Sequence, residues 1–193
     1  VWKHMKRLSR WDVCRRAEKD YGKLSHIYLH WTAGFYDQTF PDYHLNVTGT
    51  GDVLSASDCF TELLSHTYLR NSGAIGIAMC CAKDAVMYAD RSFDLGVFPP
   101  SPVQVEETAA LVALLTLTLD IPLDKAHVMT HAEAADLDGY GPALAGTNRF
   151  ERWDLYEIKD GDGKWKYGGD VLRGKAQWYR HHLASLLPFQ LAY

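Results

Sequence analysis

The feature that most constrains the fold is the segment Ala74–Cys80, in which every residue is apolar or a glycine. A short run of this kind is typical of a central strand that is covered on both faces. Such a strand needs further layers around it. The most apolar helix of the chain, expected over residues 103–119, can form one of them. Ser101 and Pro102 fit its N-cap and first turn, and Asp120 begins the segment that ends it.

The rest of the chain alternates between expected helices and strands. Residues 26–30 place Ile27 and Leu29 on one face of a strand and His26, Tyr28 and His30 on the other. Residues 43–47 and 53–54, joined by a glycine-containing turn, predict a hairpin, and residues 127–131 predict a further strand. An amphipathic helix is expected over residues 4–20. The pattern predicts an α/β domain with a central, mostly mixed β-sheet flanked by helices.

The C-terminal third begins with residues 136–148, whose Gly, Asp and Pro content predicts a long loop. A turn at residues 160–163 and a helix over about residues 170–187 follow. We expect residues 1–158 to form the main domain and residues 159–193 to be a turn and helix packed on it. The tail also carries four aromatic residues that would suit sugar stacking, although packing is the favoured interpretation: Trp165, Tyr167, Trp178 and Tyr179.

Composition and charge exclude several classes of protein. The apolar stretch 103–119 contains Glu106 and Glu107 and is shorter than the ~20 residues of a bilayer span, so it predicts a buried helix. The net charge is 20 − 24 = −4, and residues 1–23 contribute 8 − 3 = +5, which leaves −9 for the remainder. A nucleic-acid surface would have to be confined to the first helix, and we expect none. The four cysteines fit no zinc-ribbon spacing, so free thiols and a cytosolic origin are expected.

Two of the nine histidines stand out by position. His30 and His131 both lie at the carboxyl ends of expected strands, where an open α/β sheet places its ligand crevice. A catalytic zinc takes three protein ligands and leaves a fourth position for water. No HExxH pair is present, so a zinc site borne on one helix is excluded. A dispersed site of two histidines and a carboxylate remains open.

Five local motifs follow one another in a recognisable order. They are IYLHWTAG at residues 27–34, YHLNV at 43–47 before Gly49-Thr50-Gly51, Ser65-His66 leading through Asn71 to Ile75-Gly76-Ile77, Pro102-Val103-Gln104, and Thr130-His131-Ala132-Glu133. This ordered set resembles the zinc-dependent N-acetylmuramoyl-L-alanine amidases, which include phage lysozyme-type amidases and peptidoglycan recognition proteins. The resemblance covers about residues 26–158. It implies one Zn²⁺ per chain and bacterial peptidoglycan as substrate.

The resemblance implies His30 and His131 as two metal ligands. In the family an Asp or Cys, with a basic residue two places before it, supplies the third. Here Asp154 has Arg152 in that place, although it lies 23 residues after His131. We therefore predict Asp154 as the third ligand, with residues 136–148 as an inserted loop at the mouth of the site. Asp138 is the alternative ligand.

Further roles are implied by the same matches. Tyr43 is expected to contact the attacking water or the tetrahedral intermediate, and Arg152 to stabilise an oxyanion, since a guanidinium does not deprotonate at working pH. Glu133 would lie on the face of His131 if that strand continued, where it could act as a general base or orient a ligand. Substrate binding is expected from three residues: Trp31, His66 and Asn71. His44 is expected to be structural because it points to the face opposite Tyr43.

The activity implied is hydrolysis of the amide between the lactyl group of N-acetylmuramic acid and L-alanine, as in a phage or prophage endolysin. Two alternatives stay open: a non-catalytic peptidoglycan-binding module, and a cytosolic amidase that recycles anhydro-muropeptides. No signal-peptide segment is visible after Val1. If the protein is an endolysin, we therefore expect it to be made in the cytoplasm and to act at the cell wall. A different, non-peptidoglycan metallohydrolase is a further possibility.

Overall fold

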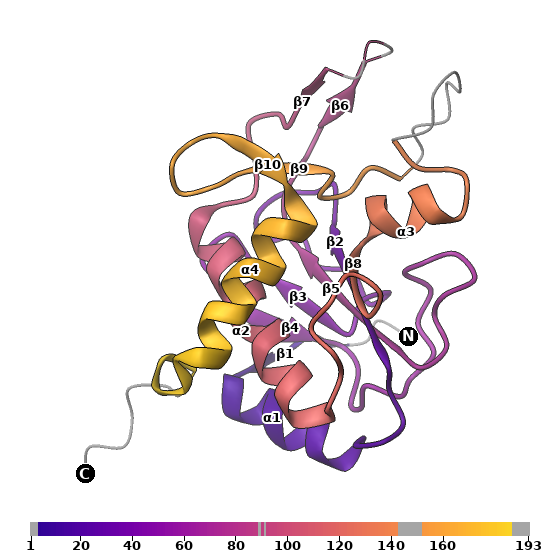
Figure 1. Cartoon of the computed structure of the whole chain (residues 1–193), viewed down its shortest axis with the longest axis vertical. Coiled ribbons are helices and arrows are strands. Elements are labelled where there is room, and N and C mark those ends of the chain that lie inside the picture. Colours follow the sequence, from indigo (N-terminus) through magenta and orange to yellow (C-terminus); the bar gives the residue numbers. More distant parts are fainter. Residues whose placement is uncertain (1–3, 89, 91, 143–151, 187–193) are drawn as a thin grey trace.

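A six-stranded mixed sheet forms the centre of the protein, and helices flank it (Figure 1). The computed structural model describes residues 4–88, 90, 92–142 and 152–186. The strand order is β1-β4-β3-β5-β2-β8, with parallel pairing from β3 through β8 and antiparallel pairing at the β1–β4–β3 end. These strands are β1 Lys6–Leu8, β2 His26–Trp31, β3 Leu45–Val47, β4 Val53–Ser55, β5 Ala74–Met79 and β8 Val128–Thr130. The predicted α/β class with a mixed sheet is confirmed.

Strand β5 lies inside the sheet and is buried along its whole length, as its apolar run predicts. Ile75 and Ile77 belong to the main core, together with Ile27 and Leu29 of β2. The opposite face of β5 carries Gly76, where a Cβ atom would come within 2.6 Å of the His66 ring. Three helices supply buried side chains to the main core: α1 Arg10–Lys19, α2 Pro102–Leu119 and α4 Gly168–His181. The sheet therefore has a helix-covered face and a face that carries histidines.

Helix α2 is long and apolar enough to cross a membrane by length and composition, but 61% of it is buried inside the protein. The predicted capping by Ser101 is confirmed, since its side chain accepts a hydrogen bond from the Gln104 backbone N–H. The Gln104 amide group also donates to the carbonyl oxygens of Val47 and Cys80, at 3.0 and 2.8 Å. One buried side chain thus joins the start of α2 to the ends of β3 and β5.

Two predicted boundaries are wrong. The helix expected over residues 4–20 is split into β1 and α1, because Ser9 and Asp12 form a capping box that starts the helix at Arg10. The loop expected from Asp136 begins later, because a short helix, α3 His131–Leu137, extends through that position. Residues 143–148 of the expected insertion lie outside the described residues. The four cysteines are free, as expected.

The C-terminal segment packs on the same core. Val171, Leu172 and Ala176 of α4 are buried among residues of α2 and the sheet, which agrees with the expected packing role. Before α4 comes a hairpin of β9 Glu157–Lys159 and β10 Trp165–Tyr167, whose turn contains the predicted residues 160–163. A second small hairpin, β6 Val86–Met87 and β7 Phe93–Asp94, projects from the body (Figure 1). A single turn, η1 Leu183–Ser185, follows α4.

Candidate metal centre

Three buried side chains from distant parts of the sequence converge at the carboxyl end of the parallel strands. His30 comes from the end of β2, His131 is the first residue of α3 after β8, and Asp154 lies in the turn before β9. Nδ1 of His30 is 3.1 Å from Nδ1 of His131 and 3.3 Å from Oδ2 of Asp154. Nδ1 of His131 is 3.2 Å from the same Asp154 oxygen. The predicted ligand set is therefore brought together as one cluster, with Asp154 as its third member.

These separations fit a tetrahedral metal ion. Zinc binds histidine nitrogen and carboxylate oxygen at about 2.0–2.1 Å, which places neighbouring ligand atoms of a tetrahedral site roughly 3.3 Å apart. Each of the three measured separations lies between 3.1 and 3.3 Å. Two imidazoles and one carboxylate also form a donor set that zinc accepts in catalytic sites. This group of residues can hold a divalent ion and leave a fourth position open.

A second ring of contacts fixes the orientation of His30. Its Nε2 lies 3.2 Å from the hydroxyl oxygen of Thr67, while its Nδ1 faces the cluster. Thr67 is itself held, since its backbone N–H donates to the side-chain oxygen of Asn71 at 2.7 Å. When a metal ion is bound at Nδ1, the proton of the neutral ring lies on Nε2, which then donates to Thr67. Nε2 of His131, in contrast, is buried with no hydrogen-bond partner among the described residues.

The environment sets the charges of the cluster. Burial lowers the pKa of His30 to about 4, despite the hydrogen bond to the Asp154 carboxylate, which favours the charged form, so the imidazole is neutral near pH 7. Burial would raise the pKa of Asp154, but the hydrogen bonds that its carboxylate accepts from His131 and His30 outweigh it and hold this pKa below its usual range. The carboxylate is therefore ionised. A neutral imidazole and a carboxylate are the protonation states that metal binding requires.

An open pocket of about 320 Å³ lies over the cluster. Its walls include Trp31, Tyr43, His66 and Arg152, four of the residues predicted to contact substrate or an intermediate. The ring of Tyr43 lies 5.1 Å from that of His30, and burial raises the pKa of the Tyr43 phenol above its usual range. Trp31 is mostly buried and packs edge-to-face against Trp153 at 4.7 Å. The pocket thus combines one cation, one neutral phenol and an aromatic wall beside the donor cluster.

Glu133 is not placed where the sequence predicted. The strand ends at Thr130, and Glu133 is the third residue of α3, where its carboxylate accepts from the Thr130 backbone N–H in a capping box. Its two oxygens also bind the Arg173 guanidinium, each at 2.8 Å. Glu133 is absent from the residues that line the pocket. The predicted strand position is wrong because it assumed a period of two residues where the chain turns into a helix.

Asp138 and Asn71 also lie away from the pocket. Asp138 forms a bidentate ion pair with Arg70, both N–O distances being 2.7 Å, so it is not the third member of the cluster. Asn71 accepts from the backbone of His66 and Thr67 and so organises the loop rather than lining the pocket. His44 is structural as expected, because its ring bridges the Glu62 carbonyl and the Gly76 backbone N–H.

Sequence reasoning missed Thr67. The residue directly follows His66, which was singled out, but a threonine in a loop carries no signal of its own. The loop that contains His66 and Thr67 lies over Gly76 of β5. This loop reaches His30 of β2 only because the two strands pair in parallel with Tyr28 opposite Gly76. Contacts of that kind depend on the sheet and cannot be read from spacing.

Comparison with known proteins adds no assignment. No protein-family model matches the chain, and no curated protein matches it significantly. The ordered motifs and the geometry of the site are therefore the observations that bear on function.

Proposed function

We propose that this chain is a zinc-dependent N-acetylmuramoyl-L-alanine amidase, an enzyme that hydrolyses the amide between the lactyl group of N-acetylmuramic acid and L-alanine in peptidoglycan. The observation that carries the proposal is the cluster of His30, His131 and Asp154, whose donor atoms have the spacing of a tetrahedral zinc site. The ordered motifs around these residues supply the substrate class. Neither feature would suffice alone.

An unactivated amide requires a stronger nucleophile than water and stabilisation of the charge that develops on its carbonyl oxygen. Zinc, when bound, lowers the pKa of a coordinated water toward ~7 and polarises the carbonyl. Arg152, on the pocket wall, carries a permanent positive charge and can donate N–H groups to the oxyanion. Tyr43 keeps its proton because its pKa is raised, so it serves as a second hydrogen-bond donor.

The completeness of the cluster favours catalysis over the alternative of a non-catalytic recognition module, which needs no third ligand. An endolysin and a recycling amidase use the same chemistry and are distinguished by the size of their substrates. That distinction depends on whether the pocket accepts polymeric peptidoglycan or small anhydro-muropeptides.

The test is mass spectrometry of purified peptidoglycan digested by the zinc-loaded protein, with a chelator-treated control. Release of stem peptides with free L-alanine amino termini, abolished by chelation, is the expected result. Bound but uncleaved peptidoglycan would favour the recognition module. Cleavage confined to anhydro-muropeptides, offered in the same assay, would favour recycling.

A further inference from the structure

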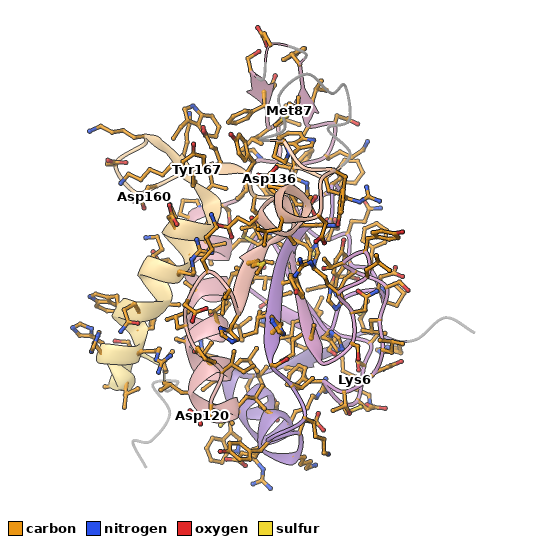
Figure 2. All side chains as sticks on the ribbon, turned by 45° about the vertical axis from the view of Figure 1, so that its right-hand side comes forward. Lys6, Met87, Asp120, Asp136, Asp160 and Tyr167 are labelled. Carbon is orange, nitrogen blue, oxygen red and sulfur yellow. The ribbon has the colours of Figure 1, made fainter. Side chains whose placement is uncertain are left out.

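Away from the metal centre, a large groove lies between α4, the β9–β10 hairpin and the start of α2. Its volume is about 1020 Å³, and Glu106, Asp160, Trp165 and Lys175 also line an adjoining hollow of about 390 Å³. Asp160 and Tyr167, two of its lining residues, lie at the upper end of α4 (Figure 2). A single small ligand fills about 300–1,000 Å³. The groove and hollow together therefore have the dimensions for an extended ligand.

Three exposed aromatic rings line this groove. Trp165 is 44% exposed, Tyr167 56% and Trp178 51%, although the helix beside them is firmly packed. Trp165 and Tyr167 are two residues apart on β10, so both point to one face of the strand at a spacing of roughly 6.7 Å. Large exposed aromatic groups that cluster in a hollow mark a binding surface rather than ordinary surface composition.

Each of the two indoles packs against a neighbouring side chain. The ammonium group of Lys159 lies 5.3 Å from the centre of the Trp165 ring. His182 stacks on Trp178 with ring centres 4.1 Å apart and an angle of 14°, and its Nδ1 bonds the Trp178 carbonyl oxygen at 2.8 Å. Rings held in this way lose little freedom on binding a ligand. They present flat, oriented platforms.

Four of the six charged residues that line the groove are paired with one another, and a fifth, Asp170, is paired with Arg173. Glu106 accepts from Lys175 at 2.8 Å and from the Tyr179 hydroxyl at 2.9 Å. Asp160 accepts from Lys166 at 2.9 Å and lies 3.5 Å from Lys175. An ionic ligand would have to break these pairs, whereas a neutral hydroxyl or acetamide group can add hydrogen bonds to them. The chemistry favours a neutral, hydroxyl-rich ligand.

We propose that this groove binds the sugar chain of a polysaccharide, as a carbohydrate site separate from the cluster of His30, His131 and Asp154. The faces of sugar rings carry C–H groups that suit the negative face of an aromatic ring, and their edges carry hydroxyls that suit the paired carboxylates and ammonium groups. Phe93 connects the two regions, since its ring lies 4.8 Å from Trp165 and 6.0 Å from Trp153 of the metal-centre pocket. A bound polysaccharide would extend toward that pocket.

Isothermal titration calorimetry of the full chain with a hexamer of β-1,4-linked N-acetylglucosamine tests the proposal. This probe carries no stem peptide, so its binding does not depend on the proposed amidase activity. We expect saturable binding that persists in chelator, in the His30→Ala variant, and when the salt concentration rises from 50 to 500 mM (~tenfold). The neutral ligand predicts that insensitivity to salt.

Substitutions locate the binding. Trp165→Ala and Trp178→Ala should each weaken it by roughly three- to tenfold, the size of one aromatic contact. Trp165→Phe, which keeps a ring, should weaken it less. Trp11→Ala is the matched control, because Trp11 is a 55% exposed tryptophan on α1 that does not line the groove. Circular dichroism verifies that each variant is folded.

Three results would overturn the proposal. One is the lack of saturable binding at millimolar concentrations of the hexamer. Another is an affinity of the Trp165→Ala and Trp178→Ala variants equal to that of the unchanged protein. The third is a dimer in sedimentation velocity that Trp165→Ala dissociates, because a second copy of the chain would then cover the groove. Hydrolysis of peptidoglycan without binding of the hexamer would contradict the carbohydrate site and leave the proposed amidase activity standing. Binding of the hexamer without hydrolysis would do the reverse.

Discussion

Asp154 and Asp138 are the two aspartates that sequence reasoning left as candidates for the third ligand, and their surroundings now separate them. Asp154 is nearly buried beside two imidazoles, whereas Asp138 is paired with Arg70. Asp154→Ala should lower zinc affinity by more than ~100-fold, since losing a direct ligand costs more than losing a residue that orients one. Asp138→Ala should leave zinc affinity unchanged. Metal analysis after dialysis against a zinc buffer measures both, and equal zinc contents would refute the assignment.

Thr67 offers a finer test at the same scale. Its hydroxyl accepts the Nε2 proton of His30 and so holds Nδ1 toward the cluster. Thr67→Val, which keeps the shape and removes the hydroxyl, should weaken zinc binding by about 10- to 100-fold. Thr67→Ser should restore most of it. Competition with a fluorescent zinc chelator gives the affinities without reference to turnover, and a valine variant with normal affinity would make Thr67 a packing residue only.

At the scale of elements, α4 is joined to the metal centre by one ion pair. Arg173 of α4 binds both oxygens of Glu133, and it donates to the Val128 carbonyl of β8 at 2.9 Å. The side chains of this pair are only 11% and 14% exposed. The contact fixes the first turn of α3, whose first residue is His131 of the candidate metal cluster. A helix expected only to pack therefore also helps to position the site.

Arg173→Met should reduce the free energy of unfolding by about 3 kcal/mol, because it removes the closest ionic partner of a largely buried carboxylate and leaves only the more distant Lys125. Zinc affinity should fall as well, since His131 is held less firmly. Lys6→Met is the control, because the Lys6–Asp58 pair is exposed and such pairs contribute ~1 kcal/mol or less. Urea denaturation of the metal-free proteins measures the difference. Equal destabilisation by the two substitutions would show that the Glu133 pair has no special role.

Most elements were predictable because their signals are local. The apolar run of β5, the alternation of β2 and the capped start of α2 depend on neighbours in sequence, and the structure has each of them. The wrong position predicted for Glu133 has a local cause too. The sequence from Thr130 to Glu133 is compatible both with a continuing strand and with the capping box that the structure has. The Arg173 contact was not predictable, because it joins residues that only the folded sheet brings together. The aromatic residues of the groove were noted in the sequence as suited to sugar stacking, but their arrangement around one groove depends on the fold.

At the scale of the whole molecule, several histidines are buried in a neutral state. Outside the ligand cluster, His44 and His66 both have a lowered pKa because of burial, that of His66 to about 2. The neutral form of His44 is also used structurally, since Nδ1 accepts from Gly76 and Nε2 donates to the Glu62 carbonyl. Protonation at Nδ1 would break the first of these bonds. The fold therefore depends on keeping these rings uncharged.

The consequence is a defined dependence of stability on pH. Unfolded histidines take up a proton near pH ~6.5, whereas these two resist it until lower pH, so the unfolded state binds more protons as the pH falls. The free energy of unfolding of the metal-free protein should be constant above pH ~7 and should decrease below pH ~6.5, by up to ~1.4 kcal/mol per pH unit for each histidine. Urea denaturation between pH ~7.5 and ~5 in chelator measures the slope. His44→Gln should lower stability at neutral pH and flatten this slope, while His181→Gln, an exposed position on α4, should leave it unchanged. A slope that is the same in all three proteins would mean that His44 is not the group that titrates on unfolding.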